Sequence, residues 1–167
     1  AEKCHVHMAL RPGTDAALAL ALMHELITHD WLDHDYLQQH TLGWPALRER
    51  ALQWPPERAA EVCGLEVQQI CDLARDYGEC AQRGEPAAIR LNYGMQRVHG
   101  GGNAVRAVAC LPALTGAWRH RAGGVLLSTS GVFPVQREAL QRPDLLGDRR
   151  PRLLNMSTLG EHLLHPG

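Results

Sequence analysis

Two short turns in this sequence combine residue types that could bind an anionic or hydrogen-bonding ligand. The first turn is Arg11-Pro12-Gly13-Thr14-Asp15, which comes directly before an apolar run typical of a helix. The first turn of a helix has free backbone N–H groups, which favour an anion. A carboxylate such as Asp15 can also accept both adjacent N–H donors of a guanine base. The alternative is that Thr14 or Asp15 caps its own helix, and spacing alone favours that alternative.

The second turn runs from Gly94 through Met95, Gln96, Arg97, Val98 and His99 to Gly100, Gly101 and Gly102. Glycine lets a backbone approach a ligand closely, and an arginine can pair with a pyrophosphate. A glutamine offers both a donor and an acceptor. The pattern is neither a GxGxxG fingerprint nor a Walker A loop, so by itself it indicates a flexible loop rather than a nucleotide site.

Histidine and cysteine patterns give weaker support for metal chemistry. His5 and His7 would share one face of a strand, and Asp30, Asp33 and Asp35 follow later in the chain. No zincin-type pair is present, so incidental histidines are favoured. The five cysteines contain no CxxC pair and are not spaced as cluster ligands, which indicates inert thiols: Cys4, Cys63, Cys71, Cys80 and Cys110. We therefore expect no catalytic residue and no metal ligand.

The elements that would position the two turns form two strand–turn–helix units. Residues 5–10 predict a short strand, which leads through the first turn into a buried helix that starts near residue 14. Residues 86–91 predict the next strand, which leads through the second turn into an apolar helix over 103–115 that contains Pro112. Between and after these units we expect helices at 31–41, 44–53, 54–63, 65–77 and 157–164, a loop at 78–85 and an extended piece at 125–127.

This order predicts a helix-rich α/β fold with an internal boundary in the loop, which gives domains at 1–85 and 86–167. Two strands do not make a stable parallel sheet, so each unit needs neighbours that this chain lacks. The chain also starts without Met and stops directly after a short helical pattern. We therefore expect an internal fragment of a longer polypeptide.

The two turns, taken in order, resemble the molybdopterin oxidoreductase family, which includes formate dehydrogenases and dimethyl sulfoxide reductases. The resemblance lies in HMALRPGTDAALALALMHELI and, later in the chain, AAIRLNYGMQRVHGGGNAVRAVACLPALTGAWRHRAGG. It implies fragments of two adjoining parallel-sheet, Rossmann-like units that flank molybdopterin guanine dinucleotide. By this resemblance Asp15 contacts a guanine, with Gly13 and Thr14 nearby. The same resemblance makes the second turn line the cofactor channel, through Gly94, Met95, Gln96, Arg97 and, less directly, His99.

The resemblance also implies a function: a cofactor-holding segment of an oxidoreductase that transfers electrons or an oxygen atom at molybdenum or tungsten. The family's cysteine cluster for an iron–sulfur centre, its metal-ligand segment and its C-terminal domain do not occur in this chain. We therefore expect the segment alone to be inactive. Its expected partners are the rest of the parent polypeptide and an electron-transfer subunit. The alternatives are a non-enzymatic helical binding or scaffold module and a histidine-based metal protein.

Composition narrows the possible classes of protein further. The chain has 167 residues, 45% of them hydrophobic and 21% charged, with a formal net charge of −1. This balance is typical of a globular protein and provides no basic surface for nucleic acid. No run is apolar for long enough to cross a bilayer, and no secretory segment opens the chain. The default location is the cytoplasm, with the periplasm as the alternative if a signal precedes this segment.

Overall fold

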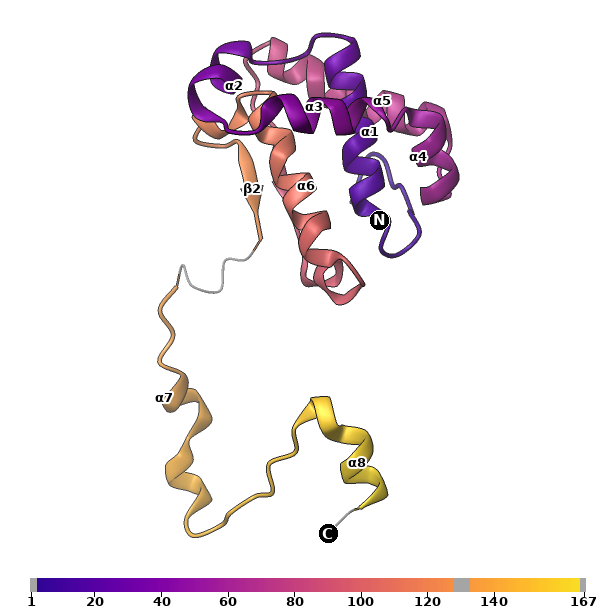
Figure 1. Cartoon of the computed structure of the whole chain (residues 1–167). Coiled ribbons are helices and arrows are strands. Elements are labelled where there is room, and N and C mark those ends of the chain that lie inside the picture. Colours follow the sequence, from indigo (N-terminus) through magenta and orange to yellow (C-terminus); the bar gives the residue numbers. More distant parts are fainter. Residues whose placement is uncertain (1–2, 128–132, 166–167) are drawn as a thin grey trace. The chain divides into compact units, whose positions relative to one another are not determined.

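A computed structural model of the chain describes residues 3–127 and 133–165. The chain divides into two compact units, Ala1–Thr129 and Ser130–Gly167 (Figure 1). The larger unit contains both candidate turns and the hydrophobic core. The smaller unit contains the short helices α7 (Arg137–Gln141) and α8 (Leu159–Leu164), and none of its described side chains is buried.

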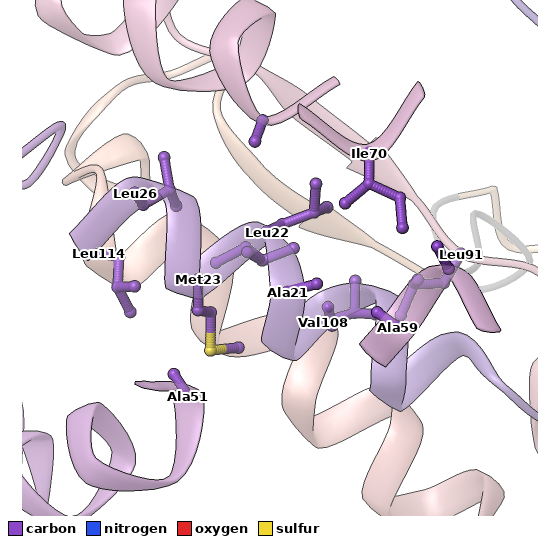
Figure 2. Packing of buried hydrophobic residues seen from close by; sticks show 14 residues of the cluster. Ala21, Leu22, Met23, Leu26, Ala51, Ala59, Ile70, Leu91, Val108 and Leu114 are labelled. Atoms are coloured by element: carbon purple, nitrogen blue, oxygen red, sulfur yellow. The ribbon is translucent and has the colours of Figure 1, made fainter. Parts of the chain in front are cut away.

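Helix α1 (Asp15–Thr28) is the centre of the larger unit and confirms the predicted buried helix. It packs against four other helices, because its alanines and leucines present apolar surface on most of its circumference. Figure 2 shows Leu22, Met23 and Leu26 of α1 beside the buried side chains of the neighbouring helices. Met23 and Leu26 have no exposed surface at all.

Four helices follow α1 and correspond to the four predicted helical patterns: α2 (His34–His40), α3 (Trp44–Leu52), α4 (Pro56–Cys63) and α5 (Val67–Gln82). The Asp33 carboxylate caps α2 by accepting the N–H of Tyr36 at 2.8 Å. Helix α4 ends at Gly64, whose φ of +71° suits the left-handed conformation that closes many helices. A reciprocal capping box of Glu66 and Gln69 starts α5.

The predicted loop at 78–85 is wrong in its first half, because α5 continues through Gly78 to Gln82. Gly78 is buried directly under the Trp31 ring. A Cβ at this position would lie only 2.5 Å from Trp31 Cε3. The glycine therefore serves the close packing of the ring on the helix and does not end the helix.

The sheet consists of two parallel strands, β1 (Ala88–Arg90) and β2 (Gly124–Leu126), with Ala88 opposite Gly124 and Arg90 opposite Leu126. The strand predicted at 86–91 is confirmed as β1, and the extended piece expected at 125–127 overlaps β2. Between them the chain forms a short 3₁₀ helix η1 (Tyr93–Arg97), helix α6 (Gly101–Leu114) and a second 3₁₀ helix, η2 (Ala117–Arg119). Helix α6 contacts both α1 and β2, and it holds the sheet against the helical core (Figure 1).

The strand predicted at 5–10 is wrong, since this segment forms no strand in the described structure. Neither β1 nor β2 pairs with it, so its backbone has no ladder. Directly after this segment, the chain is held by a backbone hydrogen bond to a helix end, in which the Arg11 N–H donates to the Cys63 carbonyl oxygen at 2.8 Å. His5 and His7 are exposed on this irregular segment.

The fold is thus a helix-rich α/β arrangement with a small two-stranded parallel sheet. The boundary expected between residues 85 and 86 falls inside the larger unit, where β1 and α6 share one core with α1. The assignment of 1–85 and 86–167 to two cofactor-binding units of a longer protein stays a prediction. In the described ranges, no helix is both long enough and apolar enough to span a membrane.

Candidate functional site

The first predicted turn adopts a tight conformation directly before α1. Gly13 has a φ of +85°, which a residue with a side chain rarely adopts. Thr14 stands at the N-cap, but its hydroxyl donates to the Arg11 carbonyl oxygen at 2.7 Å and accepts no helix N–H. The threonine therefore closes the turn on itself and does not cap α1 with its side chain.

Asp15 is the first residue of α1 and is half-buried. Across residues 3–127 and 133–165, no hydrogen bond or ion pair engages its carboxylate. Side-chain capping by Asp15, the alternative that spacing favoured, is therefore not what the structure contains. A carboxylate beside the positive end of α1 keeps its acceptor capacity for a ligand.

The second predicted turn forms most of η1 and the residues up to Gly100, while its last two residues, Gly101 and Gly102, already belong to α6. Its side chains differ in environment: Met95 is half-buried, whereas Gln96, Arg97 and His99 are exposed. These three polar side chains make no hydrogen bond or ion pair within the part of the chain that the structure describes. Gly94 has no atom within 4 Å of where a Cβ would lie, so nothing in the described chain requires a glycine there.

The structure brings the two turns into contact. A Cβ on Gly13 would lie 3.6 Å from the Cβ of Val98, directly after η1. Asp15 and Met95 also line one cavity of about 430 Å³, whose walls come from α1, α5, β1 and α6. The other predicted residues of the second turn, Gly94, Gln96, Arg97 and His99, do not line this cavity. The predicted site residues thus gather at one place in the fold but face different surroundings.

Most residues that line this cavity are apolar, and the polar ones are Asp15, Arg90 and Tyr77. The Tyr77 hydroxyl is buried and has no hydrogen bond of good geometry in the described ranges. Burial raises the pKa of the Tyr77 phenol above its ordinary value, and the Thr115 side chain acts in the opposite direction. The phenol is therefore neutral, and Thr115, the residue beside its hydroxyl, does not line this cavity.

Part of the glycine run has a role inside the chain itself. A Cβ on Gly101 would lie 2.6 Å from the Met95 carbonyl oxygen and 2.9 Å from Gln96 Cα. Gly100, with a φ of +76°, turns the chain into α6. These two glycines let the start of α6 pack against η1, so their presence needs no ligand to explain it.

The sequence placed Arg11 in the first turn and indicated an inert thiol at Cys63, but it did not predict the contacts by which these two residues hold the turn. The Arg11 guanidinium donates to carbonyl oxygens at the end of α4, and the buried Cys63 thiol donates to the Thr14 carbonyl oxygen at 3.5 Å. Two features of the sequence could have pointed to these contacts: the position of Arg11 directly before Pro12, and the helix end that Gly64 marks. The described ranges contain no group of three or more His, Cys, Asp or Glu side chains arranged to hold a metal ion.

Comparison with known proteins gives a consistent set of relatives. The chain is 43% identical over 93% of its length to the probable oxidoreductase YoaE of Bacillus subtilis, of which it covers 22%. It is 28% identical over 70% of its length to the F420-dependent formate dehydrogenase subunit alpha of Methanocaldococcus jannaschii, of which it covers 17%. The solved structure of acetylene hydratase from Pelobacter acetylenicus superposes with a TM-score of 0.66 at 27% identity, covering 72% of this chain and 16% of that one.

No family model matches the chain. The relatives, which also include a dimethyl sulfoxide reductase of Haemophilus influenzae at 31% identity, nevertheless point to one group. This chain is homologous to a segment of the molybdopterin oxidoreductase family. It spans about a fifth of the length of the curated relatives that it matches.

Proposed function

We propose that this chain is the cofactor-holding segment of a molybdenum or tungsten oxidoreductase and that its first turn binds the guanine end of molybdopterin guanine dinucleotide. The observation that carries the proposal is the Asp15 carboxylate, which is half-buried at the start of α1 and has no partner within the described ranges. Guanine presents two parallel N–H donors that one carboxylate can accept.

The residues of the second turn also fit this cofactor. The Arg97 guanidinium is exposed and unpaired within the described structure, so it can pair with a pyrophosphate. Gly94 leaves open space beside the backbone, and Gln96 and His99 offer further donors and acceptors. When bound, the cofactor supplies the redox chemistry at its metal, and this chain contributes binding and orientation.

Several finer points belong to the same proposal. The two turns stand on parts of two adjoining Rossmann-like units, which the rest of a longer polypeptide completes. That polypeptide carries the metal ligand, an iron–sulfur cluster and the contact to an electron-transfer subunit, in the cytoplasm or the periplasm. The 167 residues alone are inactive, because they supply only part of the cofactor-binding surface.

The test uses the full-length protein that contains this segment. Metal analysis and acid release of nucleotides are expected to find molybdenum or tungsten together with a guanine nucleotide. Asp15→Asn should lower the affinity for the guanine part roughly tenfold or more, since it removes a charged acceptor of two hydrogen bonds. Asp35→Asn is the matched control, because Asp35 is also an acidic residue in the first turn of a helix. A full-length protein without either metal and without guanine nucleotide would overturn the proposal.

A further inference from the structure

Arg11 binds the C-terminal end of α4 through three successive carbonyl groups, and we call this set of contacts the Arg11 clamp. Its Nη1 donates to the Glu61 carbonyl oxygen at 2.9 Å and to that of Val62 at 3.3 Å. Its backbone N–H donates to the Cys63 carbonyl oxygen at 2.8 Å. The clamp therefore joins the first turn to a helix that lies some fifty positions further along the chain.

These three carbonyls lie in the last turn of α4, where helix geometry leaves acceptors without intrahelical donors. The helix closes through the N–H groups of Gly64 and Leu65, which both bond to the Ala60 carbonyl oxygen. A guanidinium suits the remaining acceptors because it carries several donors in a planar fork and a positive charge at the negative end of the helix. A Cβ on Gly64 would lie 3.1 Å from Arg11 Nε, so the glycine leaves room for the arginine side chain.

The clamp continues into the backbone that carries Asp15. The Arg11 carbonyl oxygen accepts the Thr14 hydroxyl at 2.7 Å and the Thr14 N–H at 3.2 Å. The Thr14 carbonyl oxygen in turn accepts the Cys63 thiol at 3.5 Å. Both ends of the turn are thus tied to α4, and Asp15 is the next residue. By contrast, the described chain offers the Asp15 carboxylate no side-chain partner to set its direction.

We propose that Arg11 is a positioning residue for Asp15: the Arg11 clamp fixes the direction of the carboxylate and so sets the preference for guanine over a purine without the exocyclic amine. This inference rests on the proposed function. Arg11 acts through α4 and the Thr14 backbone, because its Nη1 and its backbone N–H both donate to main-chain oxygens of α4.

The experiment measures the dissociation constants of GDP and IDP for the full-length protein freed of its cofactor. IDP lacks the exocyclic amine, so one of the two hydrogen bonds to Asp15 is lost, and the wild-type protein should prefer GDP roughly tenfold. Arg11→Ala should reduce this preference to about twofold or less, because a carboxylate that varies in direction no longer meets both donors. Arg11→Lys, which keeps the charge without the planar fork, should give an intermediate preference.

Arg58→Ala is the matched control. Like Arg11, Arg58 is an exposed arginine that donates to a backbone carbonyl oxygen, in this case that of Gln53 at 2.8 Å. It belongs to α4 and lies over the Trp54 ring. Its removal should lower stability without changing the ratio of the two dissociation constants. Thermal unfolding of every variant identifies those that fail to fold. If Arg11→Ala fails to fold, Arg11→Lys is compared with the wild type instead.

The possible outcomes distinguish the proposed guanine contact of Asp15 from the positioning role of Arg11. A wild-type protein that binds GDP and IDP equally would contradict the proposed guanine contact itself. A wild-type preference that Arg11→Ala and Arg11→Lys both retain would overturn the role of Arg11 and leave the guanine contact standing. Equal weakening of GDP and IDP in these variants would also overturn it, since that result indicates a phosphate contact by the guanidinium.

Discussion

The backbone of Gly13 lies against the side chain of Val98, with 3.6 Å between the Val98 Cβ and the position of a Cβ on Gly13. This contact joins the two turns that the sequence singled out. The distance is an ordinary van der Waals separation, so a methyl group would fit there. The obstacle to any side chain at this position is the backbone, because Gly13 has a φ of +85°.

Gly13→Ala should therefore destabilise the protein by about 1–2 kcal/mol, the cost of a side chain in left-handed backbone. It should also lower the amount of bound guanine nucleotide, since relaxation of the strained turn moves Asp15. Gly84→Ala is the control, with a φ of +74° and no atom within 4 Å of the new Cβ. Denaturant unfolding should show similar losses for both variants. Nucleotide content that falls equally in both would contradict a specific role of the first turn.

Gly78→Ala should lower the free energy of unfolding by about 1–3 kcal/mol, as overpacking does in a close-packed core. The sign of this change in stability is informative, because a glycine-to-alanine substitution inside a helix ordinarily stabilises a protein by roughly 0.5–1 kcal/mol. Here the new Cβ would meet the Trp31 ring at 2.5 Å. Gly102→Ala in α6 has open space around its Cβ and should be neutral or stabilising. Equal effects of the two substitutions would show that Trp31 can move aside.

Leu26→Ala should cost about 2–5 kcal/mol, the range for large-to-small changes in a buried core. Leu26 has no exposed surface and lies among the helices that surround α1 (Figure 2). Leu42→Ala removes the same atoms from a side chain that is 102% exposed, so it should change stability by less than about 0.5 kcal/mol. Urea unfolding of both variants measures the difference, and a small loss in Leu26→Ala would mean that the core refills the cavity.

Tyr77→Phe should make the larger unit less sensitive to alkaline pH. Burial raises the pKa of this phenol above its ordinary value of 10.0, so the folded protein retains the phenol proton at pH values where the unfolded chain loses it. Stability from this group is therefore complete below pH 10.0 and decreases as the pH rises from there through the folded pKa.

The phenylalanine variant lacks this loss, and it also lacks a buried hydroxyl without a well-formed hydrogen bond. At neutral pH it should be as stable as the wild type or slightly more stable. Thermal unfolding between neutral and alkaline pH provides the measurement. A steeper alkaline loss in Tyr77→Phe than in the wild type would contradict the direction of the shift.

Elements that depend on local pattern could be predicted from the sequence. The apolar run after Thr14 predicted α1, the strand predicted at 86–91 was confirmed as β1, and the extended piece expected at 125–127 overlaps β2. Gly64 and Gly116 stand at helix ends with φ values of +71° and +66°, as glycines at such positions commonly do. The resemblance to the molybdopterin oxidoreductase family, stated on the two turns, is confirmed by the relatives.

Elements that depend on a distant partner could not be predicted in this way. The alternation of residues 5–10 predicted a strand, but a strand needs a neighbour, and β1 and β2 pair only with each other. Gly78 suggested a helix end because glycine has low helix propensity, yet the burial of Trp31 on it keeps the helix intact. In both places the tertiary environment outweighed the local preference.

The sequence by itself determined the residue types of the candidate site and the helices and strands that flank it, because periodicity and glycine position act locally. Only the tertiary structure decided that Gly13 meets Val98, that Asp15 shares a cavity with Met95, and that Arg11 binds the end of α4. The physical reason is that free acceptors at a helix end can bond to any donor nearby, and a glycine leaves room for any neighbouring side chain. Neither feature specifies its partner in the sequence. That partner is set by the packing of α1 among the other helices.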